Sequence, residues 1–470
     1  MIRTRFAPSP TGYLHIGGLR TALYAYLFAK KNGGKFILRI EDTDLERKVE
    51  GANEIIYRTL KSAGLNYDEG PDAGGGFGPY VQSQRKEIYA EYARRLIERG
   101  GAYYCFCTKE HLSELHKNGA AKYDKRCLKI DPAEARRRVE SGEPHVIRQN
   151  IPLTGVSSYT DLVFGEIKVD NKELEDNVLI KSDGMPTYNF ANVVDDYLMG
   201  INYVIRGVEY LSSTPKYNLI YDAMGWPRPN YIHLQPIMKD ANRKLSKRDG
   251  DASYEDFIAK GYLSDAIVNY IALLGWSPKD NREKLSLSEM QERFSLDGVS
   301  KSASIFDENK MRWLNSLYVK ELPPEKFHAL ALPFYAKLDY LKGLNLEVLS
   351  RLLQPRAEVL CDIAALTAFI AAFKDFDLSL FNNEKHKTDS AAAKALLPAL
   401  IARVENNYET LSDALAALSE SLNVKKGHVL WIFRIALSGA AVTPGGATEL
   451  TELFGKTETL ARLKATLARL

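Results

Sequence analysis

Ala7-Pro8-Ser9-Pro10-Thr11-Gly12-Tyr13-Leu14-His15-Ile16-Gly17-Gly18, near the beginning of the chain, is the stretch that decides the fold. Residues 3–7 form a predicted strand, and the two prolines that follow cannot continue it. From residue 18 to residue 31 apolar side chains recur at helical spacing, until Asn32-Gly33-Gly34 ends the helix. Residues 36–40 then form a second predicted strand. The order strand, helix, strand predicts a nucleotide-binding α/β sheet.

The same stretch carries groups suited to chemistry on ATP. The amino end of a helix attracts phosphate, because its N–H groups are unpaired and its dipole is positive there. Gly17 and Gly18 let a nucleotide approach the backbone, and His15 can donate a hydrogen bond to a phosphate as charge develops. The alternative is an ordinary turn and helix cap with an uninvolved histidine.

A second motif, Lys244-Leu245-Ser246-Lys247-Arg248, is strongly basic. Lysines on a mobile loop can close over a triphosphate and neutralise its charge, although the same residues also suit a solvated surface loop. The long interval between His15 and Lys247 fits a sheet domain that contains an insertion.

The rest of the chain divides into further parts by its composition. Strand-like segments resume near residue 178, residues 203–207 form another strand, and Ser213-Thr214-Pro215 begins a helix. Beyond residue 250 helical patterns dominate, and from about 325 the chain is rich in Ala and Leu. We therefore expect four parts: a split Rossmann-like catalytic domain (1–83 and 186–250), an α+β insertion (84–185), a connecting domain (251–322) and an all-helical region (323–470).

Composition narrows the class of protein. The 470 residues are 45% hydrophobic and 26% charged, which is typical of globular domains, and the net charge of +3 neither requires nor excludes a nucleic-acid partner. No apolar run is long enough to span a membrane, and the first residues lack the apolar core of a secretory signal. Three of the four cysteines cluster at 105, 107 and 127, which favours reduced thiols or a metal site over a disulfide framework.

Together the two motifs resemble the signatures of the class I aminoacyl-tRNA synthetases. Three positions depart from the commonest form of these signatures: Gly18 replaces a histidine, Leu245 a methionine and Arg248 a serine. The glutamate enzymes share these departures.

Within that class the whole chain resembles the bacterial glutamyl-tRNA synthetases. Glutaminyl enzymes typically carry two aspartates followed by Thr-Asn after the second strand, whereas this chain has Glu41-Asp42-Thr43-Asp44. The other matching stretches are Arg5 to Gly18, Arg39-Ile40, Gly184-Met185-Pro186-Thr187-Tyr188, Asn192-Val193-Val194-Asp195-Asp196 and Val204-Ile205-Arg206-Gly207.

A glutamate pocket needs an arginine fork for carboxylate and an acidic group for ammonium. The resemblance implies that Arg5, Tyr188 and Asn192 surround the side-chain carboxylate, that Ser9 and Glu41 take the amino group, and that Arg206 takes a carboxyl oxygen. It also implies ATP with Mg²⁺ at His15, Gly17, Gly18, Glu209 and Lys247, with His15, Lys244 and Lys247 as catalytic residues. Each residue by itself also suits a surface ion pair or a core position.

Family resemblance further implies a monomeric cytoplasmic enzyme, without a membrane partner, that binds ATP, L-glutamate and tRNA(Glu). Leu353-Gln354-Pro355-Arg356 matches the stretch in which an arginine reads the last anticodon base, so Arg356 is expected to reject tRNA(Gln).

Zinc is expected at Cys105, Cys107, Tyr123 and Cys127, because a closed structural site needs four ligands. Many relatives supply a histidine at the position that Lys129 occupies, and Tyr123 stands where a related tRNA-modifying paralogue uses a tyrosine. The alternative is a knuckle of three reduced thiols that has lost its metal.

Three rival functions stay open. A relaxed enzyme would also charge tRNA(Gln), and a short paralogue would glutamylate a modified base but lack the helical region. A catalytically inactive tRNA-binding protein would lack groups such as His15 and Lys247.

Overall fold

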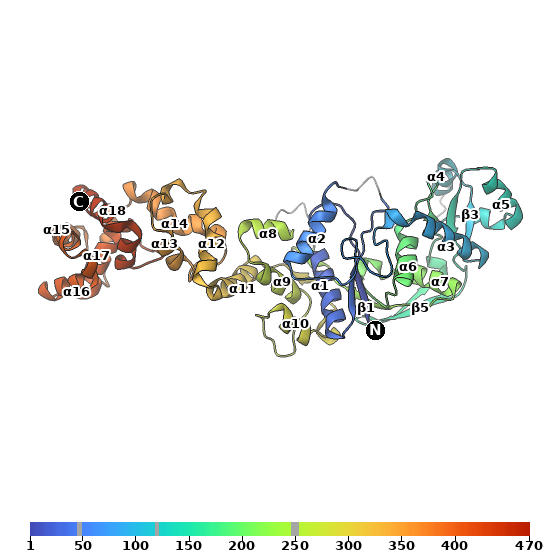
Figure 1. Ribbon diagram of the computed structural model, residues 1–470, viewed down its shortest axis with the longest axis horizontal. Coiled ribbons are helices and arrows are strands. Elements are labelled where there is room, and N and C mark those ends of the chain that lie inside the picture. The colour runs from blue at the N-terminus through green and yellow to red at the C-terminus, as the bar shows by residue number, and fades with distance from the viewer. Residues whose placement is uncertain (45–48, 118–121, 246–252) are drawn as a thin grey trace. The chain divides into compact units, whose positions relative to one another are not determined.

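The computed structural model describes residues 1–44, 49–117, 122–245 and 253–470. It forms two compact units (Figure 1). The first unit comprises Met1–Phe257 and Ile267–Asp307, and the second comprises Ile258–Ala266 and Glu308–Leu470. The finer four-part division remains a prediction.

The predicted strand, helix and strand at the start of the chain are confirmed as β1 (Arg3–Phe6), α1 (Ile16–Lys31) and β2 (Lys35–Leu38). β1 and β2 pair in parallel, and α1 packs against both. The helix begins two residues before the expected Gly18, because the side chain of His15 caps it. β2 ends before the expected Ile40, since that residue instead forms a bridge with Val81.

Later segments form a four-stranded sheet with the order β6-β5-β9-β8, which lies beside the β1-β2 pair. The predicted strand at 203–207 is confirmed as β8 (Tyr203–Gly207), which pairs in parallel with β9 (Asn230–Leu234). β9 also pairs with β5 (Val156–Asp161), and β5 forms an antiparallel hairpin with β6 (Gly165–Asp170).

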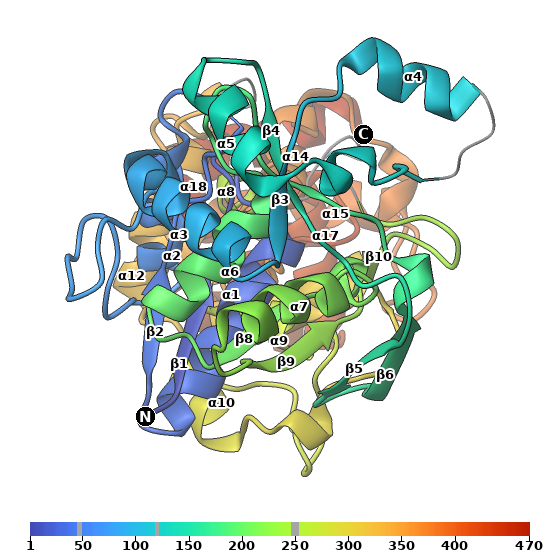
Figure 2. The same ribbon diagram turned by 90° about the vertical axis from the view of Figure 1, so that its right-hand side faces the viewer.

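The two sheets are adjacent. β1 contacts β8, and the Asn202 N–H just before β8 donates to the Arg3 carbonyl at 3.2 Å. Figure 2 shows β1 and β2 on one side of β8 and β9, and β5 and β6 on the other. Helices α6 (Tyr188–Leu198) and α7 (Thr214–Met224) carry further residues of the candidate active site.

A smaller antiparallel sheet, β3-β4-β7, is formed by strands that lie between β2 and β8 in the sequence. Its strands are β3 (Ala102–Cys105), β4 (Val146–Gln149) and β7 (Val178–Ile180). The helices around it are α3 (Lys86–Glu98), α4 (Lys109–Lys117), the 3-10 turn η3 (Arg126–Lys129) and α5 (Pro132–Glu140). Other elements that contribute to the first unit are α2 (Ala52–Ser62), β10 (Ile237–Met238), α8 (Tyr254–Lys260), α9 (Ser264–Leu273), α10 (Leu287–Arg293) and β11 (Ser304–Ile305).

The second unit is built from helices joined by turns and loops, with no β-strand among its described residues, as the Ala- and Leu-rich sequence predicts. Its apolar core is built from side chains that recur at helical spacing, such as Leu349, Leu353, Leu397 and Leu400. Its helices are α11 (Glu308–Glu321), α12 (Pro324–Tyr335), α13 (Leu346–Leu353), α14 (Ile363–Ala372), α15 (Ser390–Asn406), α16 (Leu411–Ser421), α17 (Lys426–Ser438) and α18 (Ala447–Arg469).

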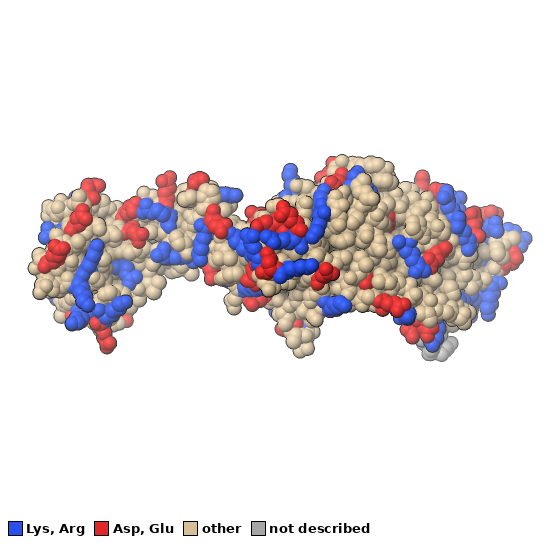
Figure 3. All heavy atoms as spheres, turned by 90° about the horizontal axis from the view of Figure 1, so that it is seen from below, with Lys and Arg blue, Asp and Glu red and all other residues tan. Residues whose placement is uncertain are grey.

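The surface matches the nearly balanced charge. Figure 3 shows lysine and arginine side chains interspersed with aspartate and glutamate on the face that it draws. Among the described helices, none has both the length and the apolar character that a membrane span requires.

Candidate active site

His15 is held at the amino end of α1 by a short-range contact. Its Nδ1 accepts the Gly17 N–H at 3.0 Å, so the proton of a neutral ring is on Nε2. A Cβ at Gly17 would lie 3.2 Å from His15 Nδ1, and a Cβ at Gly18 would lie 3.2 Å from the Leu14 side chain. Gly17 therefore leaves room for the His15 ring, and Gly18 leaves room for the Leu14 side chain.

The described residues of the second motif, Lys244 and Leu245, lie against β10. The Leu245 N–H donates to the Ile237 carbonyl at 3.0 Å, and the exposed Lys244 forms a backbone bridge with Met238. Lys247 and Arg248 lie outside the described residues. The chain is described again from Ser253, which forms a bridge with His15. The described start of the motif is thus anchored against β10, and Ser253, where the described chain resumes, is anchored at the start of α1.

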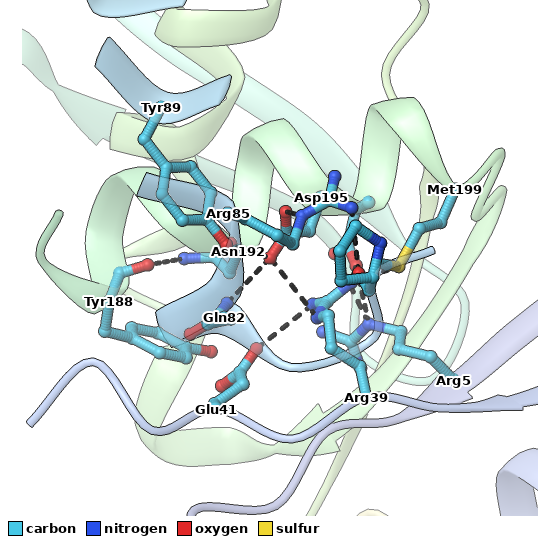
Figure 4. A network of polar contacts seen from close by, with 12 residues as sticks. Arg5, Arg39, Glu41, Gln82, Arg85, Tyr89, Tyr188, Asn192, Asp195 and Met199 are labelled. Carbon is cyan, nitrogen blue, oxygen red and sulfur yellow. Dashed lines mark hydrogen bonds and ion pairs between the residues drawn. The ribbon is translucent and has the colours of Figure 1, made fainter. Parts of the chain in front are cut away.

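A network of buried charges lies next to the ends of β1 and β2 (Figure 4). Arg5 on β1 donates from Nε to Asp196 Oδ1 at 3.0 Å and from Nη1 to the Ile205 carbonyl at 3.2 Å. Arg39, just after β2, donates to the same Asp196 oxygen at 2.7 Å and to Glu41 Oε1 at 3.1 Å. One aspartate on α6 therefore holds both arginines.

Asp195, the preceding residue of α6, anchors the other side of this network. Arg85 Nε donates to Asp195 Oδ1 at 2.7 Å, while Gln82 Nε2 and the Tyr89 hydroxyl donate to Oδ2 at 2.8 Å each. Arg39 Nε lies 3.7 Å from Asp195 Oδ2. Arg5, Arg39 and Arg85 thus balance Asp195, Asp196 and Glu41, and all six side chains are buried.

The two carboxylates that contact Arg39 ionise differently. Burial raises the pKa of Glu41, and the charges of Arg39 and Arg5 offset this only in part. Burial also opposes ionisation of Asp196, but Arg5 and Arg39 together outweigh it and lower the pKa of that carboxyl. Asp196 is therefore a firmly charged support, whereas the charge on Glu41 is poorly compensated by the protein alone.

Arg206 on β8 has a different environment from Arg5, Arg39 and Arg85. Its Nε donates to His233 Nε2 at 3.1 Å, and its Nη2 donates to Thr214 Oγ1 at 2.6 Å. The rings of Tyr210, Tyr217 and Tyr231 lie 5.0–5.3 Å from the guanidinium carbon. Among the described residues no carboxylate forms a hydrogen bond or ion pair with Arg206, although the side chain is only 5% exposed.

Other predicted pocket residues lie nearby. Ser9 is exposed, and the Pro8 carbonyl before it accepts the Glu41 N–H at 3.0 Å, which places this loop beside Glu41. The Tyr188 ring packs at 5.2 Å from the Tyr210 ring, and the Tyr188 carbonyl accepts the Asn192 amide.

Glu209 is also predicted to face the nucleotide, and it is exposed. Its carboxylate lies close to the backbone of Gly207.

The three clustered cysteines converge, as predicted. The sulfur atoms of Cys105, Cys107 and Cys127 all lie within 4.8 Å of one another, and those of Cys107 and Cys127 are 3.6 Å apart. The Tyr123 hydroxyl is 3.4 Å from both Cys105 and Cys107. Hydrogen bonds, the largest from Cys127, lower the pKa of Cys105 to about 4, whereas the bond to Cys105 raises the pKa of Cys127, so the thiolate is favoured at Cys105.

Lys129, at the position of the usual fourth ligand, is exposed.

Arg356 lies in the second unit, just after α13. Its side chain is exposed and donates to the Leu352 carbonyl at 2.9 Å. The nearby Gln354 is buried and donates to the carbonyls of Val319 and Leu322, which anchors the turn that carries Arg356.

Sequence reasoning missed the supports of the pocket. Arg39, Asp195 and Asp196 belong to the stretches that carry the family resemblance, but no role was expected for them. Their signal is present in the sequence, because two adjacent acids follow Val193 and Val194 on a helix that is otherwise buried. His233 and Asp161 gave no such signal.

The helix capped by His15, the parallel pairs β1–β2 and β8–β9, and the two sequence motifs are together those of a class I aminoacyl-tRNA synthetase. A family model described as tRNA synthetases class I (E and Q), catalytic domain, matches residues 1–313, and one described as Anticodon binding domain matches residues 326–467.

Relatives and solved structures narrow the class. The glutamate–tRNA ligase of Clostridium novyi (strain NT) is 52% identical over 477 residues, covering 100% of this chain and 98% of that protein. The ligase of Clostridium botulinum (strain Eklund 17B / Type B) is 53% identical, covering 98% of each. A crystal structure of the glutamate tRNA ligase from Elizabethkingia meningosepticum CCUG26117, in complex with its amino acid, matches with a TM-score of 0.87 at 34% identity and covers 100% of this chain and 99% of that one. The chain belongs to the glutamate–tRNA ligase family.

Proposed function

We propose that this chain activates L-glutamate with ATP and transfers it to the 3′-terminal adenosine of tRNA(Glu). The observation that carries the proposal is that the buried arginines of the pocket differ in whether a protein carboxylate compensates their charge. Arg5, Arg39 and Arg85 are neutralised by protein carboxylates, while the described residues offer none to Arg206. A ligand with net negative charge completes the balance of this pocket.

Glutamate fits that requirement and glutamine does not. Bound glutamate brings two carboxylates and one ammonium, so it supplies one net negative charge beside Arg206 and Arg5. Its ammonium also supplies a positive partner for Glu41, whose charge is penalised by burial. A buried charge left without its partner costs about 3–5 kcal/mol, and glutamine would leave the pocket with one excess cation.

The first step forms glutamyl-adenylate. The α-carboxylate of glutamate attacks the α-phosphorus of ATP, the bond from that phosphorus to the bridging oxygen breaks, and pyrophosphate leaves with the bond electrons. The Mg²⁺ that accompanies ATP belongs to the substrate. His15, Lys244 and Lys247 stabilise the charge that develops on the phosphate oxygens.

The second step transfers the amino acid. The terminal ribose 2′-hydroxyl of tRNA attacks the acyl carbon of the adenylate, the acyl–phosphate bond breaks, and AMP leaves as the hydroxyl proton is released. No protein nucleophile is needed, and Glu41, Arg5 and Arg206 hold the amino acid during both steps.

The helical unit selects the tRNA through Arg356. The exposure of this side chain, and the buried Gln354 that anchors its turn, support a base-reading role. On its Watson–Crick edge, cytosine at the last anticodon position offers the acceptors N3 and O2 to a guanidinium, whereas guanine presents the donors N1–H and N2–H₂ to a group that has only donors. Arg356 therefore favours tRNA(Glu) over tRNA(Gln).

The three cysteines and Tyr123 are a plausible set of ligands for one structural Zn²⁺. Tetrahedral zinc with thiolate bonds of about 2.3 Å separates its sulfurs by roughly 3.8 Å, close to the 3.6 Å between Cys107 and Cys127. Tyr123 would supply the fourth ligand, an oxygen, in place of the missing histidine. Bound zinc would pin β3 to η3 and take no part in the reaction. We further propose a cytoplasmic monomer.

Charging of separated tRNAs with labelled glutamate tests the proposal. Glutamylation of tRNA(Glu) with formation of AMP is expected, with much weaker charging of tRNA(Gln). Equal charging of both would establish the relaxed enzyme, and no charging of either would establish an inactive tRNA-binding relative.

A further inference from the structure

A chain of polar contacts crosses three neighbouring strands and ends on Arg206. Arg206 on β8 and His233 on β9 are register partners, and Asp161 ends β5 on the other side of β9. His233 Nδ1 lies 2.7 Å from Asp161 Oδ2, and His233 Nε2 accepts from Arg206 Nε at 3.1 Å. Asp161 and His233 are 1% and 0% exposed, so water does not reach this chain of contacts.

The surroundings of Asp161 determine which ring nitrogen carries the proton. Asp161 Oδ1 accepts the N–H groups of Val163 and Phe164 at 2.9 and 2.8 Å, and Oδ2 accepts the His233 N–H at 3.1 Å. The Asp161 oxygens act as acceptors toward three backbone N–H groups, so the nearby Nδ1 donates to the same carboxylate. Nε2 is then left with its lone pair, and it can accept from Arg206.

The guanidinium of Arg206 is also held along a second edge. Thr214 Oγ1 accepts from Arg206 Nη2 at 2.6 Å and donates its own proton to the Tyr210 carbonyl at 2.8 Å. With Nε and one Nη2 hydrogen engaged, three of the five N–H bonds of Arg206 have no partner among the residues described here. These three bonds are available for a carboxylate.

We infer that Asp161 and His233 are positioning residues that aim Arg206 at a carboxyl group of glutamate. The inference rests on the proposed function, because it gives a role to the arginine that the proposal places against the substrate. Both acceptors that hold the guanidinium, the His233 ring and the Thr214 hydroxyl, are uncharged. A carboxylate in either place would neutralise Arg206 and compete with the substrate, whereas neutral acceptors orient the guanidinium and leave its charge for glutamate.

Burial supports the neutral form of the ring. Desolvation lowers the pKa of His233, and the nearby charge of Arg206 acts in the same direction, although Asp161 opposes both. A protonated ring would also present an N–H to the N–H of Arg206.

The test compares His233→Leu, His233→Gln and Arg206→Gln, alone and combined, by tRNA-dependent pyrophosphate exchange and by thermal unfolding. Leucine removes the acceptor, and we expect the KM for glutamate to rise about tenfold or more, since the lost hydrogen bond involves a charged group. The KM for ATP should stay nearly unchanged. Glutamine keeps an acceptor for Arg206 and should restore most of the loss.

A double variant distinguishes a positioning role of His233 from a general loss of structure. If His233 acts through Arg206, the KM for glutamate in the double variant His233→Leu/Arg206→Gln should equal that of Arg206→Gln alone. The matched control is Ser157→Ala on β5, which loses a buried hydrogen bond to Asn171 but does not contact Arg206. It should leave both KM values unchanged.

Each contrary result has its own meaning. A normal KM for glutamate in His233→Leu, or an equal rise for ATP, would overturn the positioning role while leaving the proposed function intact. An additive double variant would also overturn it. A normal KM in Arg206→Gln would refute the placement of glutamate itself, and the positioning role with it. If His233→Leu does not fold, the test rests on His233→Gln. The inference is then overturned if the KM for glutamate in His233→Gln differs from that of the unmutated enzyme by more than about threefold.

Discussion

The two carboxylates that share Arg39 should respond in opposite ways when each is replaced by its amide. Asp196 accepts from both Arg5 and Arg39, at 3.0 and 2.7 Å, and it is 2% exposed. Asp196→Asn leaves two buried cations short of an anion, and removal of one partner from a buried pair costs about 3–5 kcal/mol. At roughly 2 °C per kcal/mol for a large unit, the first unit should melt about 6–10 °C lower.

Glu41→Gln should leave the melting temperature almost unchanged. Glu41 accepts from Arg39 at 3.1 Å, which an amide oxygen can replace, and burial already penalises its charge, as its raised pKa shows. The expected change in the free energy of unfolding is within about 1 kcal/mol. Its effect on substrate should be large, because an amide attracts the ammonium of glutamate weakly, and the KM for glutamate should rise about 10–100-fold.

At acid pH the difference in melting temperature between the unmutated protein and Asp196→Asn should become smaller. Because the native pKa of Asp196 is lowered, the stability it contributes is complete above the ordinary aspartate pKa and is lost as the pH falls through the native value. Thermal unfolding of both variants from pH 7 into the acid range measures this directly. An equal loss of melting temperature in Glu41→Gln at neutral pH, or a difference that does not narrow in acid, would refute the reasoning.

Three further predictions concern catalysis, tRNA choice and metal. Lys247→Ala should slow adenylate formation about 10²–10³-fold while glutamate binding changes little, as measured by single-turnover activation, and near-normal activation would exclude its catalytic role. Arg356→Gln should reduce the preference for tRNA(Glu) by about tenfold without altering tRNA-dependent exchange, whereas unchanged preference would remove Arg356 from anticodon reading. Purified protein should carry about one equivalent of zinc by elemental analysis, lost in Cys107→Ser, and metal-free protein with full charging activity would contradict the zinc site.

Much of the catalytic framework could be predicted because its signals are local. The strands and the helix around His15 are marked by prolines, glycines and apolar spacing, and these place β1, α1 and β8 within a few residues of their observed bounds. The ends were less accurate, since the start of α1 depends on a histidine cap and the end of β2 on pairing with Val81. Such contacts leave no mark in the spacing of residues.

The predicted pocket residues were those on motifs, and the residues that support them were not found. Arg5 and Arg206 both read as arginines at strand ends, yet one is neutralised by Asp196 and the other is held by uncharged groups. That difference depends on partners 191 and 27 positions away, which only the fold brings together. The sequence could therefore indicate which side chains face glutamate, but not how their charges are balanced.

The most direct test of the account is ATP-dependent activation of glutamate against glutamine, with tRNA(Glu) present, in the unmutated enzyme and in Arg206→Gln. The account predicts exchange with glutamate, little exchange with glutamine, and a large loss for glutamate in the variant, because its buried cation has gone. Equal activation of glutamine by the unmutated enzyme, or full glutamate activation in Arg206→Gln, would contradict the claim that an unpaired buried charge selects the substrate.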